Sequence, residues 1–366
     1  MKSELMSIGA GVVALSAGLS AGAPQIEELG WVLEREIDFA DPISALYNPI
    51  DGLIYAGDRD ADVFVVNEDG TRSQVGNTAE VGGLAVDPRT GDLYMAEDFP
   101  GRVRRIAFGT TTAATWVSGF DGGDDDPAGV CFVPEDYVGT LFTPGGMALT
   151  DRGFGSANEI WSFQTASAEG EAEVFDDGAG GELVDPFDIA VRADGFVVIA
   201  DSTNGLQLLL DGGAGTGTVI PFTTTPALTA VDGVAFDGRS DDLFAIDADL
   251  DAVVRVDTVT GAATTVISAV GLGVTEWGNI NIDNGPETQR MVVSVRDADK
   301  IYVFAAVPGC NNADLSVPFG VLDLSDINLF VTAFTGQNPI ADFDDNGIWD
   351  LSDVVAYIDA FVAGCP

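Results

Sequence analysis

The residues with the most specific chemistry lie near the C-terminus, in the segment 342–353. Side chains that carry oxygen stand at positions 1, 3, 5, 9 and 12 of this segment: Asp342, Asp344, Asn346, Asp350 and Asp353. Gly347 occupies position 6, where a sharp turn is needed, and Ile348 at position 7 can offer its backbone carbonyl. Because Ca²⁺ takes six to eight oxygen ligands, this spacing predicts a calcium-binding loop. The alternative is a solvated acidic turn.

A second, less complete copy of this segment lies just upstream. The stretch 313–334 aligns with 341–361, about 28 residues further on, and each copy leads from an acidic loop into an apolar helical segment. The first copy has one extra residue and places Val317, Pro318 and Phe319 where ligands are expected. The candidate ligands that it keeps are Asp314, Ser316, Asp323 and Asp326. We therefore expect one complete calcium site and one degenerate or empty site.

The tandem loop–helix units, each ending in Ala-Phe, are similar to a dockerin module. The flanking Gly309-Cys310 and Gly364-Cys365-Pro366 resemble the GC-type dockerin of secreted planctomycete-like proteins. The resemblance implies a calcium-folded helix pair over 307–366 that docks on a cohesin-like protein or another cell-surface component. It also implies which residues contact that partner: Leu324, Ser325, Leu351 and Ser352. The alternative is that the helix pair docks on its own chain.

Upstream, from about residue 30 to 306, the chain repeats a pair of short strands around an Asp/Gly turn. The repeat is clear at 45–58, 83–98, 188–201 and 233–247, and weaker at 129–134 leading on to 159–163 and at 279–283 leading on to 291–295. Third strands follow at 63–66, 103–107, 206–209, 253–256 and 301–304. This spacing predicts a six-bladed β-propeller within 24–306. We predict that the alternating segment 31–37 completes the last blade and closes the ring.

The strand–turn–strand pattern is similar to propellers of the NHL and gluconolactonase-like group, over roughly 270 residues. The resemblance implies a divalent ion at the channel, held by an acidic residue of the first blade, two Asn and an Asp. Asp232 matches the stretch that supplies the Asp, and Asn279 is a candidate for one Asn, although it is one blade out of place. In the first blade, Asp41 stands where a glutamate is expected.

Acidic residues also recur in the loops around the predicted inner strands. Those before or at the start of inner strands are Asp41, Glu80, Asp185, Asp188 and Asp232, and those after second strands are Asp58, Glu97, Asp98, Asp201, Asp247, Asp297 and Asp299. One interpretation is a ring of carboxylates at the channel mouth, which would raise pKa values or recruit a divalent cation. The alternative is that each carboxylate caps its own turn.

Composition excludes several classes of function. The 366 residues include 59 acidic and 15 basic residues and no histidine, for a net charge of −44. The missing histidine excludes Ser-His-Asp and Cys-His catalysis and histidine-bound zinc. The charge disfavours nucleic acid and anionic membrane surfaces as partners, because both attract clustered Lys and Arg.

The N-terminus predicts export. Lys2, an apolar run over 8–19 and small residues at 20–23 are typical of a signal peptide over 1–23; the alternative is an uncleaved membrane anchor. In an exported protein, Cys310 and Cys365 bracket the repeats and predict a disulfide, with Cys131 free; the alternative is three reduced thiols.

Two functions are consistent with these patterns. The first is a secreted, calcium-binding scaffold without enzymatic activity, in which the propeller binds a carbohydrate or protein ligand and the helix pair docks on a partner. The second is an extracellular hydrolase that acts on a lactone or polysaccharide with a channel metal, localised by the helix pair.

Overall fold

The structure is a computed structural model of the whole chain. It describes residues 24–365 apart from 29–30, 60–61, 68, 78–80, 99–100, 119–125, 153–157, 165–171, 177–180, 214, 239, 269, 271–277, 284–288, 307–310, 312, 317–320, 337–340, 342 and 344–347. The predicted signal peptide and residues 342 and 344–347 of the predicted calcium loop therefore lie outside the described residues.

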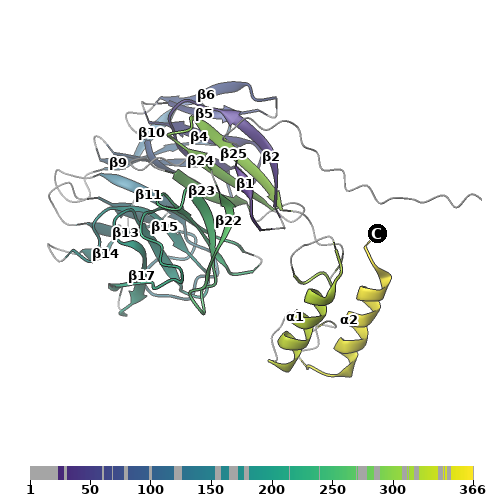
Figure 1. Cartoon of the computed structure of the whole chain (residues 1–366). Coiled ribbons are helices and arrows are strands. Elements are labelled where there is room, and N and C mark those ends of the chain that lie inside the picture. Colours follow the sequence, from purple (N-terminus) through teal and green to yellow (C-terminus); the bar gives the residue numbers. More distant parts are fainter. Residues whose placement is uncertain are drawn as a thin grey trace, which may run out of the picture.

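The strands form six antiparallel sheets arranged in a ring, with two helices beyond it (Figure 1). The inner strands of neighbouring sheets contact each other all the way around: β3, β7, β11, β15, β19, β23 and back to β3. The predicted mainly β, six-bladed propeller is confirmed.

The blades follow the chain in order. The first blade contains β3 (Pro42–Tyr47), β4 (Ile54–Asp58), β5 (Asp62–Val66) and β6 (Arg72–Asn77); the second contains β7 (Val81–Val86), β8 (Leu93–Glu97), β9 (Arg102–Ile106) and β10 (Ala113–Ser118). The third contains β11 (Pro127–Phe132), β12 (Met147–Asp151), β13 (Glu159–Phe163) and β14 (Ala172–Asp176); the fourth contains β15 (Pro186–Val191), β16 (Val197–Asp201), β17 (Gly205–Asp211) and β18 (Gly217–Pro221). The fifth contains β19 (Val231–Phe236), β20 (Leu243–Asp247), β21 (Ala252–Val256) and β22 (Ala263–Ser268).

The sixth blade is closed by a strand from the other end of the described chain. Its strands β23 (Gly278–Asp283), β24 (Arg290–Val295) and β25 (Lys300–Ala306) are joined by β2 (Trp31–Asp38), which pairs antiparallel with β25. This is the predicted closure of the ring. The short β1 (Gln25–Ile26), which the sequence pattern did not indicate, adds a fifth strand beside β22 of the fifth blade.

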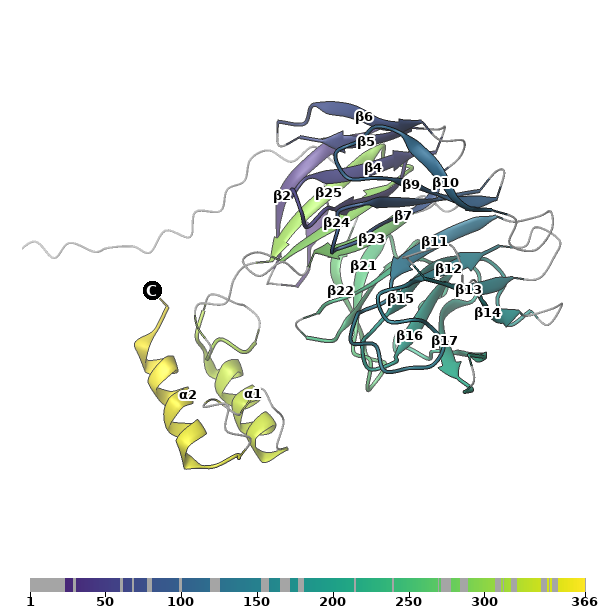
Figure 2. The same cartoon turned by 180° about the vertical axis from the view of Figure 1, so that it is seen from behind.

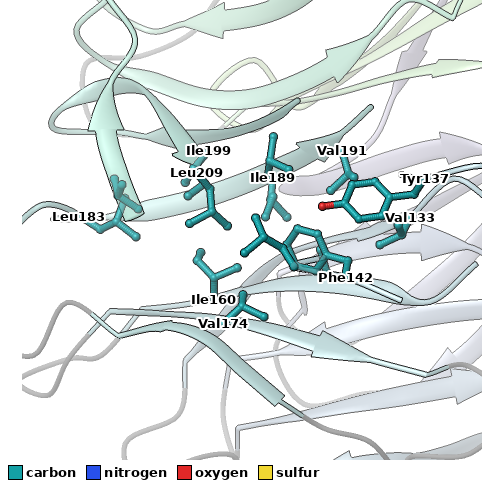
Figure 3. Close-up of a cluster of buried hydrophobic side chains, with 14 residues drawn as sticks. Val133, Tyr137, Phe142, Ile160, Val174, Leu183, Ile189, Val191, Ile199 and Leu209 are labelled. Carbon is teal, nitrogen blue, oxygen red and sulfur yellow. The ribbon is translucent and has the colours of Figure 1, made fainter. Parts of the chain in front are cut away.

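The third blade differs from its prediction. The segment 159–163 was expected to be the strand that follows the inner strand, but it is the third strand, β13, and β12 lies between them. The segment 133–146 separates β11 from β12, so the usual short turn is missing and the repeat is harder to recognise. Tyr137 and Phe142 of this insertion are buried against blade four (Figure 3).

The buried hydrophobic side chains of the propeller form clusters that lie between adjacent blades, one at each of the six interfaces. Near the axis the inner strands approach so closely that glycine is required. A Cβ atom on Gly83 would lie 2.4 Å from the carbonyl oxygen of Ala128, and one on Gly129 would lie 2.5 Å from the Cα of Asp188. The centre of the ring is thus tightly packed at these positions.

The two C-terminal helices are α1 (Leu324–Thr335) and α2 (Leu351–Ala363), and they lie beside each other away from the blades (Figure 2). Their small core is centred on Phe330 and Tyr357, whose rings stack with centroids 4.0 Å apart. Two C-terminal helices are therefore present as expected. The boundary at 306/307 between two domains stays a prediction.

Candidate functional site

A polar cluster joins four inner strands at the propeller axis. The Asn279 amide of β23 donates from Nδ2 to Oδ2 of Asp188 on β15 (3.3 Å), and its Oδ1 accepts from the hydroxyl of Ser44 on β3 (3.1 Å). The same Oδ2 of Asp188 accepts from the backbone N–H of Val234 on β19 (3.0 Å). These residues of blades one, four, five and six lie far apart in the sequence, so only the closed ring brings them together.

The pairing of the inner and second strands is irregular near the start of the inner strand in five blades, and in two of them the irregularity lies at a channel acid. The register between the inner and second strands shifts between Pro186 and Asp188 in blade four, and between Val231 and Gly233, on either side of Asp232, in blade five. A bulge of this kind turns a side chain away from the regular alternation of a strand. It lets a carboxylate lie near the axis where an alternating strand would direct an apolar side chain.

Both of these acids are buried, and burial changes their acidity. Removal from water raises the pKa of the Asp188 carboxyl to about 7, against the opposing effect of hydrogen bonds from the backbone of Val234 and Ile189. Burial also raises the pKa of Asp232 to about 7, and the nearby carboxylates of Asp185 and Asp247 act in the same direction. Carboxyl groups that titrate near neutrality can exchange protons with a ligand or substrate.

Two other acids at this end of the strands, Asp201 and Asp247, accept hydrogen bonds from nearby backbone. Asp201 at the end of β16 accepts from the N–H groups of Val184 (2.7 Å) and Asn204 (2.7 Å). Asp247 at the end of β20 accepts from Thr229 (3.0 Å) and Leu250 (3.0 Å) in the same way. For these positions the turn-capping alternative is confirmed.

Arginines neutralise further acids of the predicted ring. Arg296 of blade six forms an ion pair with Asp41 of blade one, and Arg152 pairs with Asp98 (3.6 Å) and Asp185 (3.4 Å). Glu97 is paired with Arg102 and Arg104. The acid at the first-blade position of the gluconolactonase-like resemblance is thus held by a guanidinium group. No group of three or more His, Cys, Asp or Glu residues with metal-site geometry occurs among the residues that the structure describes.

In the first loop–helix unit, the acid at the twelfth position folds back onto its own loop. Oδ1 of Asp326 accepts from the N–H of Leu315 (2.8 Å), the N–H of Ser316 (2.8 Å) and the hydroxyl of Ser316 (3.1 Å). Oδ2 accepts from the N–H of Asp323 (2.8 Å), which is the N-cap of α1. The Asp326 side chain is completely buried, and Asp314 is also buried.

The second unit repeats this arrangement where it is described. Oδ1 of Asp353 accepts from the N–H of Phe343 (2.7 Å) and Oδ2 from the N–H of Asp350 (2.9 Å), which caps α2. Asp353 is completely buried, whereas Ile348 is exposed. The remaining predicted ligands Asp342, Asp344 and Asn346 lie outside the described residues, so calcium binding stays a prediction.

The predicted partner contacts lie on the surface. Leu324 and Leu351 are 72% and 73% exposed, and Ser325 and Ser352 beside them are exposed as well. Sequence reasoning missed the continuation of this surface along α2. Val355, Ile358 and Val362 follow Leu351 at helical spacing and are each at least half exposed, which makes an apolar stripe. Their separations of four, three and four positions could have been recognised in the sequence as one face of a helix. A shallow depression lies over the first part of the stripe, lined by Leu351, Ser352, Val355, Ala356 and Asp359.

Among the cysteines, Cys131 is a free thiol in the third blade, as expected. Burial strongly raises its pKa, which opposes nucleophilic reactivity. Cys310 lies outside the described residues, so its pairing with Cys365 stays a prediction. No helix within the described ranges is long and apolar enough to cross a membrane.

Comparison with solved structures shows the fold of the propeller. A gluconolactonase from Xanthomonas campestris superimposes with a TM-score of 0.60 at 16% sequence identity, covering 78% of this chain and 95% of that one. A structural-genomics target described as a candidate gluconolactonase gives 0.58 at 14% identity, covering 76% and 92%. No family model matches the sequence, and no curated protein matches it. At these identities the likeness establishes the six-bladed propeller alone.

Proposed function

We propose that the protein is an exported scaffold that docks in a calcium-dependent manner. In this proposal the loop 342–353 binds one Ca²⁺ and orders the helix pair. The helix pair docks on a cohesin-like protein or another cell-surface component, and the propeller binds a carbohydrate or protein ligand.

One observation carries the proposal: both loop–helix units separate an inward acidic side from an outward apolar side. The carboxylates of Asp326 and Asp353 are completely buried against their own loops, while Leu324 and Leu351 at the starts of the same helices are exposed. In a calcium loop, the acid at position 12 must point inward to reach the ion. The exposed leucines are left for a partner.

The apolar stripe of α2 supports a docking role. Four exposed apolar side chains on one face of a 13-residue helix exceed what a solvated helix needs. Residues 307–366 contain nine aspartates and no Lys or Arg. We therefore expect the partner surface to combine an apolar centre with surrounding basic residues.

Thermal unfolding of the full chain under calcium titration tests the calcium part. After treatment with a chelator, we expect added Ca²⁺ to raise the unfolding temperature of the helix pair and to leave the propeller transition unchanged. A ligand that binds only the folded state stabilises it by about 2.7 kcal/mol at one hundred times its Kd. Asp342→Asn should abolish the shift, and Asp314→Asn, its match in the first unit, should not. Absence of any shift with the unsubstituted chain would refute the proposal.

A second candidate function rests on the channel. Asp188 and Asp232 are buried carboxyls with pKa values near 7, in a propeller that shares its fold with a gluconolactonase. Such groups could serve as general acid or base in the hydrolysis of a lactone or sugar ester. The geometry does not favour the channel metal site that the gluconolactonase-like resemblance implies. Asp41 is paired with Arg296, and Asn279 is hydrogen-bonded to both Asp188 and Ser44.

Hydrolysis of simple sugar lactones by the full chain, with and without added divalent ions, tests this candidate. We expect activity to fall at least tenfold in Asp232→Asn and to persist in Asp257→Asn, which alters an exposed turn. An unsubstituted chain without activity at any metal concentration would remove the hydrolase from consideration.

A further inference from the structure

The acid at the twelfth position of the first loop–helix unit accepts four hydrogen bonds from protein donors, three on Oδ1 and one on Oδ2. A carboxylate offers about four lone-pair sites. Asp326 receives four hydrogen bonds, from the N–H groups of Leu315, Ser316 and Asp323 and from the Ser316 hydroxyl, at 2.8 to 3.1 Å. A cation that bound Asp326 in the usual bidentate manner would have to displace these donors.

We infer that the first unit closes on this hydrogen-bond network instead of a metal ion, and that it is the calcium-independent half of the helix pair. Hydrogen bonds to a charged acceptor are stronger than those between neutral groups. Because Asp326 is completely buried, its charge must be compensated inside the protein. The four donors provide that compensation without an ion.

The sequence difference between the two loops explains why only one of them would need calcium. Ser316 stands at the third loop position of the first unit, and Asp344 stands at the corresponding position of the second. The Ser316 hydroxyl donates to Asp326, whereas an ionised aspartate at the same loop position has no proton to donate to a carboxylate. We therefore expect a cation to be required only in the second unit, as in the proposed function.

The first unit can then serve as the surface on which the second unit orders. Helix α1 has a complete capping box of its own, formed by Asp323 and Asp326. It presents Phe330 to the Tyr357 ring of α2, and these rings are nearly parallel at an interplanar angle of 6°. The order of assembly, with calcium completing the second unit, rests on the proposed function. The hydrogen-bonded closure of the first unit does not.

Amide hydrogen exchange of the full chain, measured by mass spectrometry with chelator and with Ca²⁺, tests the inference. We expect peptides within 315–335 to be protected in both conditions and peptides within 343–363 to gain protection only with Ca²⁺. Native mass spectrometry should count one calcium ion. Two bound ions, or protection of 315–335 that appears only with calcium, would overturn the inference. Protection of 315–335 in chelator together with no calcium bound would uphold it and refute the proposed function.

Three variants at serine positions isolate the hydroxyl group. In chelator, Ser316→Ala should lower protection of 315–326 at least tenfold, while Ser316→Thr, which keeps a hydroxyl, should retain it. Ser325→Ala is the matched control, because the network uses only the backbone N–H of Ser325, which donates to Asp323. Equal protection in Ser316→Ala and the unsubstituted chain would contradict the role assigned to this side chain.

Discussion

In the propeller, each blade is covered on both faces by its neighbours, and a hydrophobic cluster fills every interface of the ring. In the helix pair, a single cluster around Phe330 and Tyr357 provides the core, and several large apolar side chains remain exposed on α2. The two regions also balance their acids differently. Arginines and turn amides neutralise the propeller acids, whereas residues 307–366 have neither Lys nor Arg.

A blade and a loop–helix unit differ in what completes the fold of each. A blade is completed by the next blade, and the ring by a strand from the other end of the described chain. A loop–helix unit has only one neighbour, so its loop must be closed by its own hydrogen bonds or by an ion. Small domains with few buried residues commonly need such additional stabilisation.

Removal of the closing strand should have the largest effect. A chain that begins at Phe39 lacks β2, exposes the edge of β25 and loses the contact of Trp31 with Phe244. We expect the propeller transition to fall by more than 10 °C or to lose cooperativity in calorimetry. A chain that ends at Ala306 is the control and should keep its propeller transition. A small change in the shortened chain would show that the ring does not depend on this closure.

Removal of one ring of the stacked Phe330–Tyr357 pair should unfold the helix pair and leave the propeller folded. Tyr357→Ala removes the ring that stacks on Phe330 and should cost about 3–5 kcal/mol, typical of a buried aromatic residue. We expect the helix pair to unfold while the propeller transition stays in place, as followed by far-ultraviolet circular dichroism and calorimetry. Ile358→Ala, on the exposed stripe, should change stability by less than about 0.5 kcal/mol.

The buried carboxyl group of Asp188 makes the stability of the propeller depend on pH. The pKa of Asp188 is about 7 in the folded protein and lower in the unfolded chain, so the folded state holds a proton that the unfolded state has lost. Its stability contribution is complete below the unfolded pKa and declines as the pH rises toward 7, by at most about 1.4 kcal/mol per pH unit. Above pH 7 the decline is complete.

We therefore expect Asp188→Asn to gain stability relative to the unsubstituted propeller between pH 5 and pH 8, as measured by denaturant unfolding. Asp211→Asn is the control: hydrogen bonds from Thr140 lower the pKa of Asp211 in the folded protein, so its contribution changes only below the ordinary aspartate pKa of about 3.9, and its profile should run parallel to that of the unsubstituted chain between pH 5 and pH 8. Parallel pH profiles for Asp188→Asn and the unsubstituted chain would contradict the assigned acidity.

Loss of a helix cap should have the smallest effect. Asp323→Ala and Asp350→Ala each remove the side chain that accepts from the N–H of Ser325 or Ser352, and each should cost about 1 kcal/mol in chelator. With calcium present, Asp350→Ala should cost more than Asp323→Ala, because position 9 belongs to the predicted ion site only in the second loop. If the two substitutions lowered stability equally in the presence of calcium, Asp350 would not be a ligand of a bound ion.

Much of the fold could be predicted because its signals are local. Alternating apolar residues around Asp/Gly turns predict paired strands, their recurrence predicts six blades, and the spare strand 31–37 matches the blade that lacked a fourth strand. The third blade was misread because the insertion 133–146 separates β11 from β12, which hides β12 from a search for short turns. The calcium ligands Asp342, Asp344 and Asn346 stay predictions from spacing.

The number of blades, the closing strand and the two C-terminal helices follow from the amino-acid sequence, because strand and helix periodicities are properties of neighbouring residues. The meeting of Ser44, Asp188 and Asn279 at the axis is a property of the folded ring, and so is the pairing of most acids near the channel mouth with amides or arginines. These contacts join different blades or loops, and burial depends on what the rest of the chain places around a side chain.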